Sequence, residues 1–282
     1  MFIKPVRPLR LVTALTCSLV FTTTGCFANS WSEISAPLRG SARSIGRVAN
    51  GCIAGATILP RDGLGFQVMH LERNRYWGHP NLIETLQQIG REVARQGLGH
   101  LHIGDLSQPR GGPMPFGHRS HQSGLDADIW FDLDPNLHLR LDPLRANLSA
   151  PSMLNAARKG LDHGLWNRRH HEVLKIATEQ AEMERIFVNP HIKRELCRDV
   201  RGDHRWLHKI RPWYGHDDHF HIRLNCPPGS PECEAQEPVP AGDGCDAASL
   251  DWWLQQPLPP SKPQPVPILP MPDSCRQVLN SR

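Results

Sequence analysis

Six cysteines constrain the fold of this chain more than any other feature of its sequence. The chain has 282 residues and eight cysteines, of which Cys17 and Cys26 lie near the N-terminus and six are spread from Cys52 to Cys275. An even number of cysteines in an exported protein is typical of a disulfide framework. No C-x-x-C pair is present, which favours three disulfides over a thiolate zinc site. Cys226 and Cys233 flank a Pro- and Gly-rich turn and suit a local bridge, whereas spacing alone leaves the other pairings open.

Residues 1–28 have the pattern of an export signal. Basic residues precede an apolar stretch from Leu11 to Phe21, which is too short to cross a bilayer. The pattern predicts cleavage after Ala28. The alternative is a lipoprotein signal in which Cys26 carries the lipid. We therefore expect a periplasmic protein without a transmembrane helix, anchored to the outer membrane if Cys26 is lipidated.

The charge of the chain argues against a nucleic-acid partner. The formal net charge is +4, and three of the positive charges lie in the signal, at Lys4, Arg7 and Arg10. The remaining chain is close to neutral, whereas nucleic-acid-binding domains normally carry a basic footprint. A hydrophobic fraction of 39% is enough to form a packed core, so a folded globular protein is expected.

The apolar pattern predicts irregularly alternating helices and strands. The clearest helix is Asn81–Gln96, with one apolar stripe and Asn81 as its cap. Further predicted helices are 152–159, 171–183 and 190–198; predicted strands are 100–103, 126–131, 186–188 and 219–224; predicted loops are 29–60 and 104–117. This order favours an α+β fold with a central antiparallel sheet, flanking helices and loops, and three disulfides.

The C-terminal residues 257–282 are expected to form an arm. Half of the residues from Pro257 to Pro272 are proline, which predicts an extended polyproline-type segment. Cys275 is expected to attach this arm to the body. The predicted organisation is a signal (1–28), one domain (29–256) and the arm.

Histidine and aspartate are concentrated in two segments, 117–128 and 216–221. The two-residue period of a strand puts His219 and His221 on one face, and Asp126 and Asp128 on one face. A catalytic zinc ion typically takes three His or Asp/Glu ligands and leaves a fourth position for water. The two segments together therefore predict a zinc cleft.

Spacing alone leaves the choice of ligands open. Either His118 or His121 can pair with Asp126 or Asp128, because both carboxylates share a face. His100 and His102 form a second His-x-His on a predicted strand and compete with His219 and His221.

Several segments closely resemble the penicillin-insensitive murein endopeptidases: 120–128, 211–221, 76–80, 185–190 and 242–245. The resemblance covers nearly everything after the signal, including the six cysteines. It implies that residues 29–256 form a zinc metallopeptidase domain that cuts the D-alanyl–meso-diaminopimelyl cross-links of peptidoglycan. A D,D- or L,D-carboxypeptidase and a non-catalytic zinc- or wall-binding module are the alternatives.

The family pattern is a His, six residues, an Asp and a later His-x-His. Carried onto this chain, it implies that His121, Asp128 and His221 bind Zn²⁺. His219 would be the general base, and His216 would line the site and stabilise charge or move a proton. The implied disulfides are Cys52–Cys275, Cys197–Cys245 and Cys226–Cys233.

Other nearby residues have two interpretations each. Asp126 either orients a ligand histidine or is a solvated strand residue. Arg119, Arg211 and Arg223 either bind substrate carboxylates or form surface ion pairs, and Trp213 and Tyr214 either line the cleft or pack. His118 matches a histidine that binds a further metal in some members of the family. Its expected partners would fall near 158–163, but the pair Asp162-His163 has a different spacing, so we predict one zinc ion.

Overall fold

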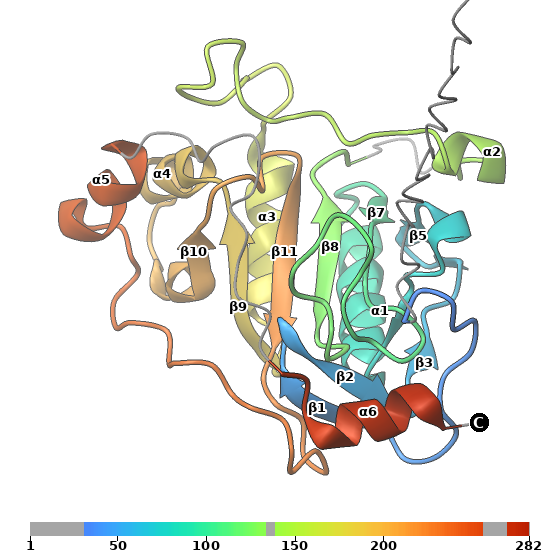
Figure 1. Ribbon diagram of the computed structural model, residues 1–282. Helices are drawn as coiled ribbons and strands as arrows, with labels where there is room; N and C mark the ends of the chain where they lie inside the picture. Colours follow the sequence, from blue (N-terminus) through green and yellow to red (C-terminus); the bar gives the residue numbers. More distant parts are fainter. Residues whose placement is uncertain (1–30, 134–138, 256–269, 282) are drawn as a thin grey trace, which may run out of the picture.

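A seven-stranded mixed sheet forms the centre of the protein. The computed structural model describes residues 31–133, 139–255 and 270–281 (Figure 1). In this part of the chain the strands lie in the order β10-β9-β11-β8-β7-β5-β4. Their bounds are β4 Asp62–Gly63, β5 Phe66–Val68, β7 Leu101–Ile103, β8 Asp126–Trp130, β9 Met183–Val188, β10 Ile210–Pro212 and β11 His219–Leu224.

The middle of the sheet is antiparallel, as predicted. Strands β9, β11, β8 and β7 pair antiparallel in that order, whereas β5–β7 and β9–β10 are parallel. The predicted strand 219–224 is confirmed as β11, and 126–131 as β8. The α+β class is therefore confirmed, with parallel pairs added toward both edges of the sheet.

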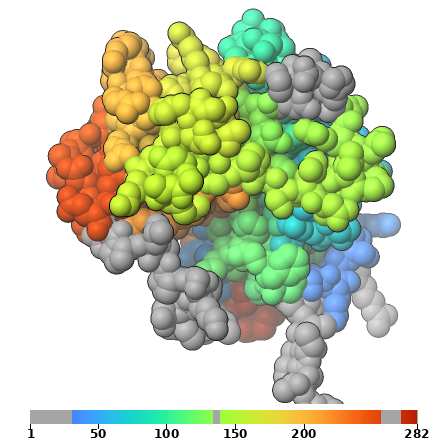
Figure 2. Space-filling view, turned by 90° about the horizontal axis from the view of Figure 1, so that it is seen from above, coloured from blue at the N-terminus to red at the C-terminus, as the bar shows by residue number. Residues whose placement is uncertain are grey.

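Helices cover one face of the sheet and leave the other to loops. Helices α1 (Pro80–Arg95) and α3 (Arg168–Thr178) lie on one face, and α4 (Pro190–Asp199) and α5 (Ala247–Gln255) lie beyond the β10 edge (Figure 1). The short elements are α2 Asp142–Arg145, η1 Leu71–Arg73 and η2 Arg205–Lys209. Residues 139–167, which lead to α3, spread over the upper end of the molecule (Figure 2). Within the described ranges, no helix combines the length and apolarity that a membrane crossing requires.

Helix α1 shows why the predicted apolar stripe forms a helix. Its side chains Leu82, Leu86, Ile89 and Val93 are fully buried in the main core. The predicted cap was wrong, because the cap is His79, whose Nδ1 accepts the Asn81 backbone N–H at 3.2 Å. Pro80 occupies the first turn, where a missing N–H costs nothing.

A second, smaller layer closes the lower end of the fold. Strands β1 (Arg43–Arg47) and β2 (Asn50–Ala54) form an antiparallel ribbon, and α6 (Asp273–Asn280) packs beneath it (Figure 1). Strands β3 (Thr57–Ile58) and β6 (Trp77–Gly78) form another short pair. The expectation that 29–60 is loop-like was therefore wrong. Glycines and polar residues weaken the alternation of this segment, and the strands are stabilised instead by Trp31, Ile45, Cys52, Cys275 and Val278, which form their own cluster.

Three disulfides join the pairs that the family resemblance implies. They are Cys52–Cys275, Cys197–Cys245 and Cys226–Cys233, with Cα–Cα distances of 5.6, 5.5 and 5.8 Å. The first ties α6 to β2. The predicted signal and most of the proline-rich arm lie outside the described residues, and the part of the arm after Pro272 is the helix α6.

Two helix predictions need correction. Residues 152–159 form turns rather than a helix, because the Met153 N–H donates to Asp217 and Leu154 bridges to Leu161. The predicted helix 171–183 runs from Arg168 to Thr178, and Met183 already belongs to β9. The helix predicted over 190–198 is confirmed as α4, which is opened by Asn189 and Pro190.

Candidate metal centre

The site is built on two neighbouring antiparallel strands, β8 and β11. Their register places Asp128 opposite His221 and Asp126 opposite Arg223. Directly opposed residues of an antiparallel pair share a face, so all four side chains point to the side of the sheet without helices. The prediction of a half-buried β8 was wrong, because every residue of this strand is buried. The face that carries the aspartates is covered by the loop between β7 and β8.

That covering loop delivers His121. The residue adopts a left-handed backbone with φ of 68°, which is uncommon outside glycine. Its backbone N–H donates to Oδ2 of Asp126 at 3.1 Å. Its Nε2 lies 3.4 Å from Oδ1 of Asp128, and its ring centroid lies 4.7 Å from that of His221. A strained backbone held by a buried aspartate is typical of a functional position.

Asp126 is the anchor of the site. Its two oxygens accept hydrogen bonds from Nε and Nη2 of Arg223 at 2.8 and 2.9 Å, and Nε2 of His221 lies 3.3 Å from Oδ2. Although burial alone would raise the pKa of this carboxyl, Arg223 and His221 hold it well below its usual range. Of the two interpretations of Asp126, the geometry fits the one that orients a histidine. Asp126 is fully buried and contacts a ring nitrogen, so it is not a solvated residue.

Asp128 is the centre of the cluster. Its Oδ1 lies 3.0 Å from Nδ1 of His221 and 3.6 Å from Nε2 of His219, and its Oδ2 lies 3.3 Å from Nδ1 of His118. Burial raises the pKa of the Asp128 carboxyl, but the surrounding histidines, His219 and His121 first, bring it well below its usual range. The carboxylate is therefore ionised at neutral pH.

The donor atoms of this cluster fit a metal ion. Among the described residues, both ring nitrogens of His121 and Oδ1 of Asp128 are buried without a hydrogen bond of normal geometry, even though Nδ1 of His221 lies 3.0 Å from that oxygen. Buried polar atoms normally have partners, so unpaired ones converging on one point require an explanation. Two triads have ligand atoms within 4.8 Å of one another: His118, His121 and Asp128, and His121, Asp126 and His221. Imidazole and carboxylate are ligands that suit zinc.

His118 is held by residues that the sequence did not reveal. Its Nε2 lies 3.1 Å from Oδ2 of Asp105, which also accepts a hydrogen bond from Nη1 of Arg75 at 2.8 Å. Burial alone would raise the pKa of Asp105, but His118 and Arg75 lower it to about 2. Asp105 lies in an irregular Gly- and Pro-containing loop, where no periodicity marks it.

Two further histidines line the cluster. Nδ1 of His219 lies 2.5 Å from Oδ1 of Asp218, and its ring centroid lies 5.0 Å from that of His216. Burial works against a charged His219, but Asp128 and Asp218 raise its pKa to about 9. Burial and then the neighbouring His221 and His219 lower the pKa of His216 to about 3, so this ring is neutral at neutral pH. His216 also has a left-handed backbone, with φ of 51°.

The remaining residues that the sequence suggested for the site lie in different places. Arg119 is exposed on the covering loop, and Arg223 is committed to Asp126. Arg211 lies on β10, two strands from β11, where its Nη1 approaches Gly244. His102, one of the competing pair His100 and His102, lies 3.5 Å from Asp132 and outside the two candidate metal-binding triads.

Phe187 is a site neighbour that the sequence did not single out. It pairs with His221 across β9 and β11, and the two ring centroids are 5.5 Å apart. Trp213 contacts Phe187 with a centroid distance of 5.7 Å. These aromatic contacts depend on pairing between strands that are far apart in the sequence, so only the fold could reveal them.

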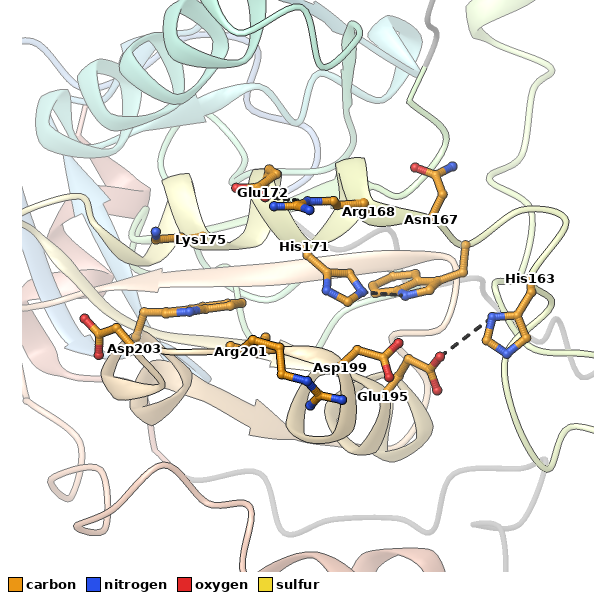
Figure 3. Close-up of a pocket in the computed structure, with 13 residues that line it drawn as sticks. His163, Asn167, Arg168, His171, Glu172, Lys175, Glu195, Asp199, Arg201 and Asp203 are labelled. Atoms are coloured by element: carbon orange, nitrogen blue, oxygen red, sulfur yellow. Dashed lines mark hydrogen bonds and ion pairs between the residues drawn. The ribbon is translucent and has the colours of Figure 1, made fainter.

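A separate cavity of about 600 Å³ lies away from these histidines, between α3 and α4 (Figure 3). Its side chains largely pair with one another: Trp166 donates to His171 at 3.1 Å, Arg168 to Glu172 at 3.2 Å, and His163 lies 3.7 Å from Glu195. None of the predicted catalytic or metal-binding residues lines this cavity. It therefore does not mark the reaction site.

The mixed sheet carries converging histidines and aspartates that could hold a metal ion, and with the family match this defines the protein as a metallopeptidase. The chain belongs to the penicillin-insensitive murein endopeptidase family, whose model matches residues 44–280. Proteins named penicillin-insensitive murein endopeptidase are similar along most of its length. The relative from Klebsiella pneumoniae (strain 342) is 43% identical over 255 residues, covering 90% of this chain and 92% of the relative. The relative from Haemophilus influenzae is 44% identical over 259 residues, covering 89% and 88%, and one from Yersinia pestis is 40% identical over 254 residues, covering 90% and 91%.

Proposed function

We propose that this protein is a zinc-dependent murein endopeptidase that hydrolyses the D-alanyl–meso-diaminopimelyl cross-links of peptidoglycan. The observation that carries the proposal is the buried cluster around Asp128, whose Oδ1 and the ring nitrogens of His121 have no hydrogen bond of normal geometry among the described residues. Family membership supplies the reaction class, since the named relatives are murein endopeptidases.

The family pattern and the hydrogen bonds together favour His121, Asp128 and His221 as the zinc ligands. Asp126 is a poor ligand because Arg223 occupies both of its oxygens. His221 directs Nε2 to Asp126, which leaves Nδ1 facing Asp128. A carboxylate behind a ligand histidine fixes its tautomer and orientation, and this is the role we assign to Asp126.

His118 is assigned a supporting role rather than that of a ligand. Its Nε2 faces Asp105 and its Nδ1 faces Asp128, an arrangement like that of His221 with Asp126 and Asp128. The choice of His221 over His118 therefore rests on the family pattern. The buried Arg75–Asp105 pair holds this ring in place.

His219 is the proposed general base. Zinc held by the three ligands would lower the pKa of a water molecule and polarise the scissile carbonyl. Nδ1 of His219 faces Asp218, and Nε2 lies 3.6 Å from Oδ1 of Asp128. Asp128 and Asp218 raise the pKa of this ring to about 9 and so hold it protonated, and a cation bound at Asp128 would oppose that charge. In the neutral form, Nδ1–H would donate to Asp218 and the lone pair would lie on Nε2. Nε2 therefore points into the cluster with the geometry of a proton acceptor.

His216 has a different protonation state and a different role. Its Nδ1 lies 3.0 Å from the Tyr214 carbonyl and donates to it, and its low pKa keeps the ring neutral. A neutral ring does not supply a fixed positive charge. A ring with so low a pKa also takes up a proton poorly, so of the roles that the sequence suggested we keep only that His216 lines the site beside His219 and His221.

The proposed location follows from the substrate. An enzyme that cuts murein works outside the cytoplasm, at the cell wall, and we infer the periplasm. The proposed organisation is a signal (1–28), a metallopeptidase domain (29–256) and an arm (257–282) that Cys275 attaches to the body. The nearly neutral charge of the chain after the signal leaves nucleic acid out as a partner.

Digestion of purified cross-linked muropeptides, read by mass spectrometry, tests the proposal. Dimers should fall to monomers with intact stems, cleavage should stop with a chelator, and added zinc should restore it. Stems that lose a terminal residue while dimers persist would select a D,D- or L,D-carboxypeptidase. If the zinc-loaded protein cleaves neither bond, the non-catalytic module becomes the favoured interpretation, and His219 is not a general base.

A further inference from the structure

A continuous row of aromatic side chains runs outward from the histidines of the candidate metal centre. It consists of Phe187, Trp213, Tyr214, Trp253 and Trp252, which we call the aromatic ledge. Its inner end is Phe187, whose ring centroid lies 5.5 Å from that of His221 and 6.1 Å from that of His216.

Successive ring contacts carry the ledge to the surface. Centroid distances are 5.7 Å from Phe187 to Trp213, 5.5 Å from Trp213 to Trp253, and 5.1 Å from Trp253 to Trp252. Trp213 is 52% exposed and Trp252 is 55% exposed. Exposed tryptophans in one connected patch are uncommon on a soluble surface and mark a binding surface.

A disulfide and a hydrogen bond hold the aromatic ledge in place. Its outer half is α5, at the β10 edge of the sheet beside α4 (Figure 1). The Cys197–Cys245 disulfide attaches the chain just before α5 to α4. The Tyr214 hydroxyl donates to the Trp253 carbonyl at 2.8 Å and joins α5 to the segment that carries His216.

The chemistry of the ledge selects a neutral partner with flat apolar faces. None of its five side chains carries a charge. Arg223 lies 5.1 Å from the Phe187 ring, but its guanidinium is engaged by Asp126. Stem peptides carry free carboxylates, and these five uncharged side chains cannot form ion pairs with them. The pyranose rings of the glycan strand are uncharged, and their C–H faces suit an indole surface.

We propose that the aromatic ledge binds the glycan strand of peptidoglycan and so holds the attached stem peptides at the metal centre. This inference rests on the proposed function for its substrate. It adds a binding surface for sugar to a site whose chemistry acts on peptide. Continuity with His221 and His216 is what links the ledge to the reaction.

Trp252 is the residue to change, because it is the ledge residue farthest along the chain of contacts from the histidines. Trp252→Ala should weaken pelleting of the metal-free protein with peptide-free glycan strands by about 5- to 10-fold. Trp252→Phe keeps a flat ring and should retain most of the binding, whereas Trp252→Leu keeps apolar bulk and should lose it. Leu64→Ala is the matched control, because Leu64 is exposed and lies between β4 and β5, at the edge of the sheet opposite to β10.

Cleavage assays separate this inference from the proposed function. On intact sacculi, Trp252→Ala should raise KM with little change in kcat. On a peptide-only cross-linked dimer, it should cleave as well as the unmodified protein. Any of three results would contradict the proposed role of the aromatic ledge. These are unchanged glycan binding in Trp252→Ala, equal binding by Trp252→Phe and Trp252→Leu, and an equal loss of cleavage by Trp252→Ala on both substrates. Failure of the unmodified protein to cut the peptide-only dimer would instead count against the proposed function.

Discussion

Arg223 on β11 holds Asp126 on β8 through two hydrogen bonds, 2.8 and 2.9 Å long, directly behind the candidate metal centre. The same carboxylate receives the backbone N–H of His121 and lies 3.3 Å from Nε2 of His221. One buried ion pair therefore fixes two of the three proposed zinc ligands. It also explains why a charged arginine lies beneath a site that gathers histidines.

Removing either partner should weaken zinc binding without removing a ligand. Asp126→Asn and Arg223→Met should each lower the zinc affinity about 10- to 100-fold, because the ligand histidines lose their orientation. Each should also lower the free energy of unfolding by about 3–5 kcal/mol, since the remaining charge is buried without its partner. Competition with a metal-sensitive dye measures the first effect, and urea unfolding measures the second.

A surface pair provides the control for this prediction. Glu92 and Arg95 form an exposed ion pair on α1, so Glu92→Gln should leave zinc affinity unchanged and alter stability by less than about 1 kcal/mol. Unchanged zinc affinity in Asp126→Asn would show that Asp126 is only a structural partner of Arg223.

Asp218 should be required for turnover rather than for zinc binding. Its Oδ1 accepts the hydrogen bond that keeps the proton of His219 on Nδ1. In Asp218→Asn the amide can present an N–H instead, which favours the tautomer with its lone pair on the wrong nitrogen. We expect kcat to fall by about 10²- to 10⁴-fold with near-normal zinc content. Asp273→Asn, at an exposed position on α6, should retain full activity. If Asp218→Asn keeps its kcat, His219 is not oriented by Asp218.

Zinc should stabilise the folded protein through His121. For zinc at about 100 times its dissociation constant, linkage predicts a gain of about 2.7 kcal/mol, seen as a higher melting temperature. His121→Asn should abolish this gain, and asparagine tolerates the left-handed backbone of this position. His118→Asn should keep the gain, because His118 is not among the proposed ligands. A gain that disappears with His118 and survives the loss of His121 would contradict the ligand set.

The strands of the site could be predicted from sequence, whereas their pairing could not. His219–Leu224 alternates so regularly that its two faces are evident from residue order. That Asp128 stands opposite His221 depends on a register between strands about ninety residues apart, which no local pattern encodes. Family resemblance supplied the proposed His121, Asp128 and His221 set, and the structure supplied the two hydrogen bonds that commit Asp126 to Arg223.

The elements that escaped prediction depend on long-range contacts. Strand β2 contains Asn50 and Gly51 and has little strand character of its own, but its partner β1 and the Cys52–Cys275 bridge to α6 hold it in place. Asp105 and Phe187 became part of the site only because folding brought their segments beside His118 and His221.

Lys193 should make stability depend on pH in the alkaline range. Its side chain is fully buried in α4, and Nζ donates to the carbonyls of Leu207, at 2.8 Å, and Asp243. Burial, together with the neighbouring Arg211, lowers the pKa of Lys193 to about 7, against about 10.4 in the unfolded chain. Between these values the unfolded chain binds more protons than the folded one, so this group adds stability as pH rises from about 7 to about 10. The slope approaches roughly 1.4 kcal/mol per pH unit.

Comparison with Lys193→Met isolates this contribution. His219 acts in the opposite direction, because its folded pKa of about 9 makes its stabilisation decline as pH rises from about 6.5 through 9. Both proteins retain His219, so the difference between their unfolding free energies reports Lys193 alone. Urea unfolding of chelator-treated protein from pH 7 to 10 should show a more positive slope in the unmodified chain than in Lys193→Met. Lys175→Met, at an exposed position on α3, should keep the unmodified slope. Parallel slopes for the unmodified chain and Lys193→Met would mean that Lys193 stays charged in the fold, with its two carbonyl acceptors offsetting the cost of burial.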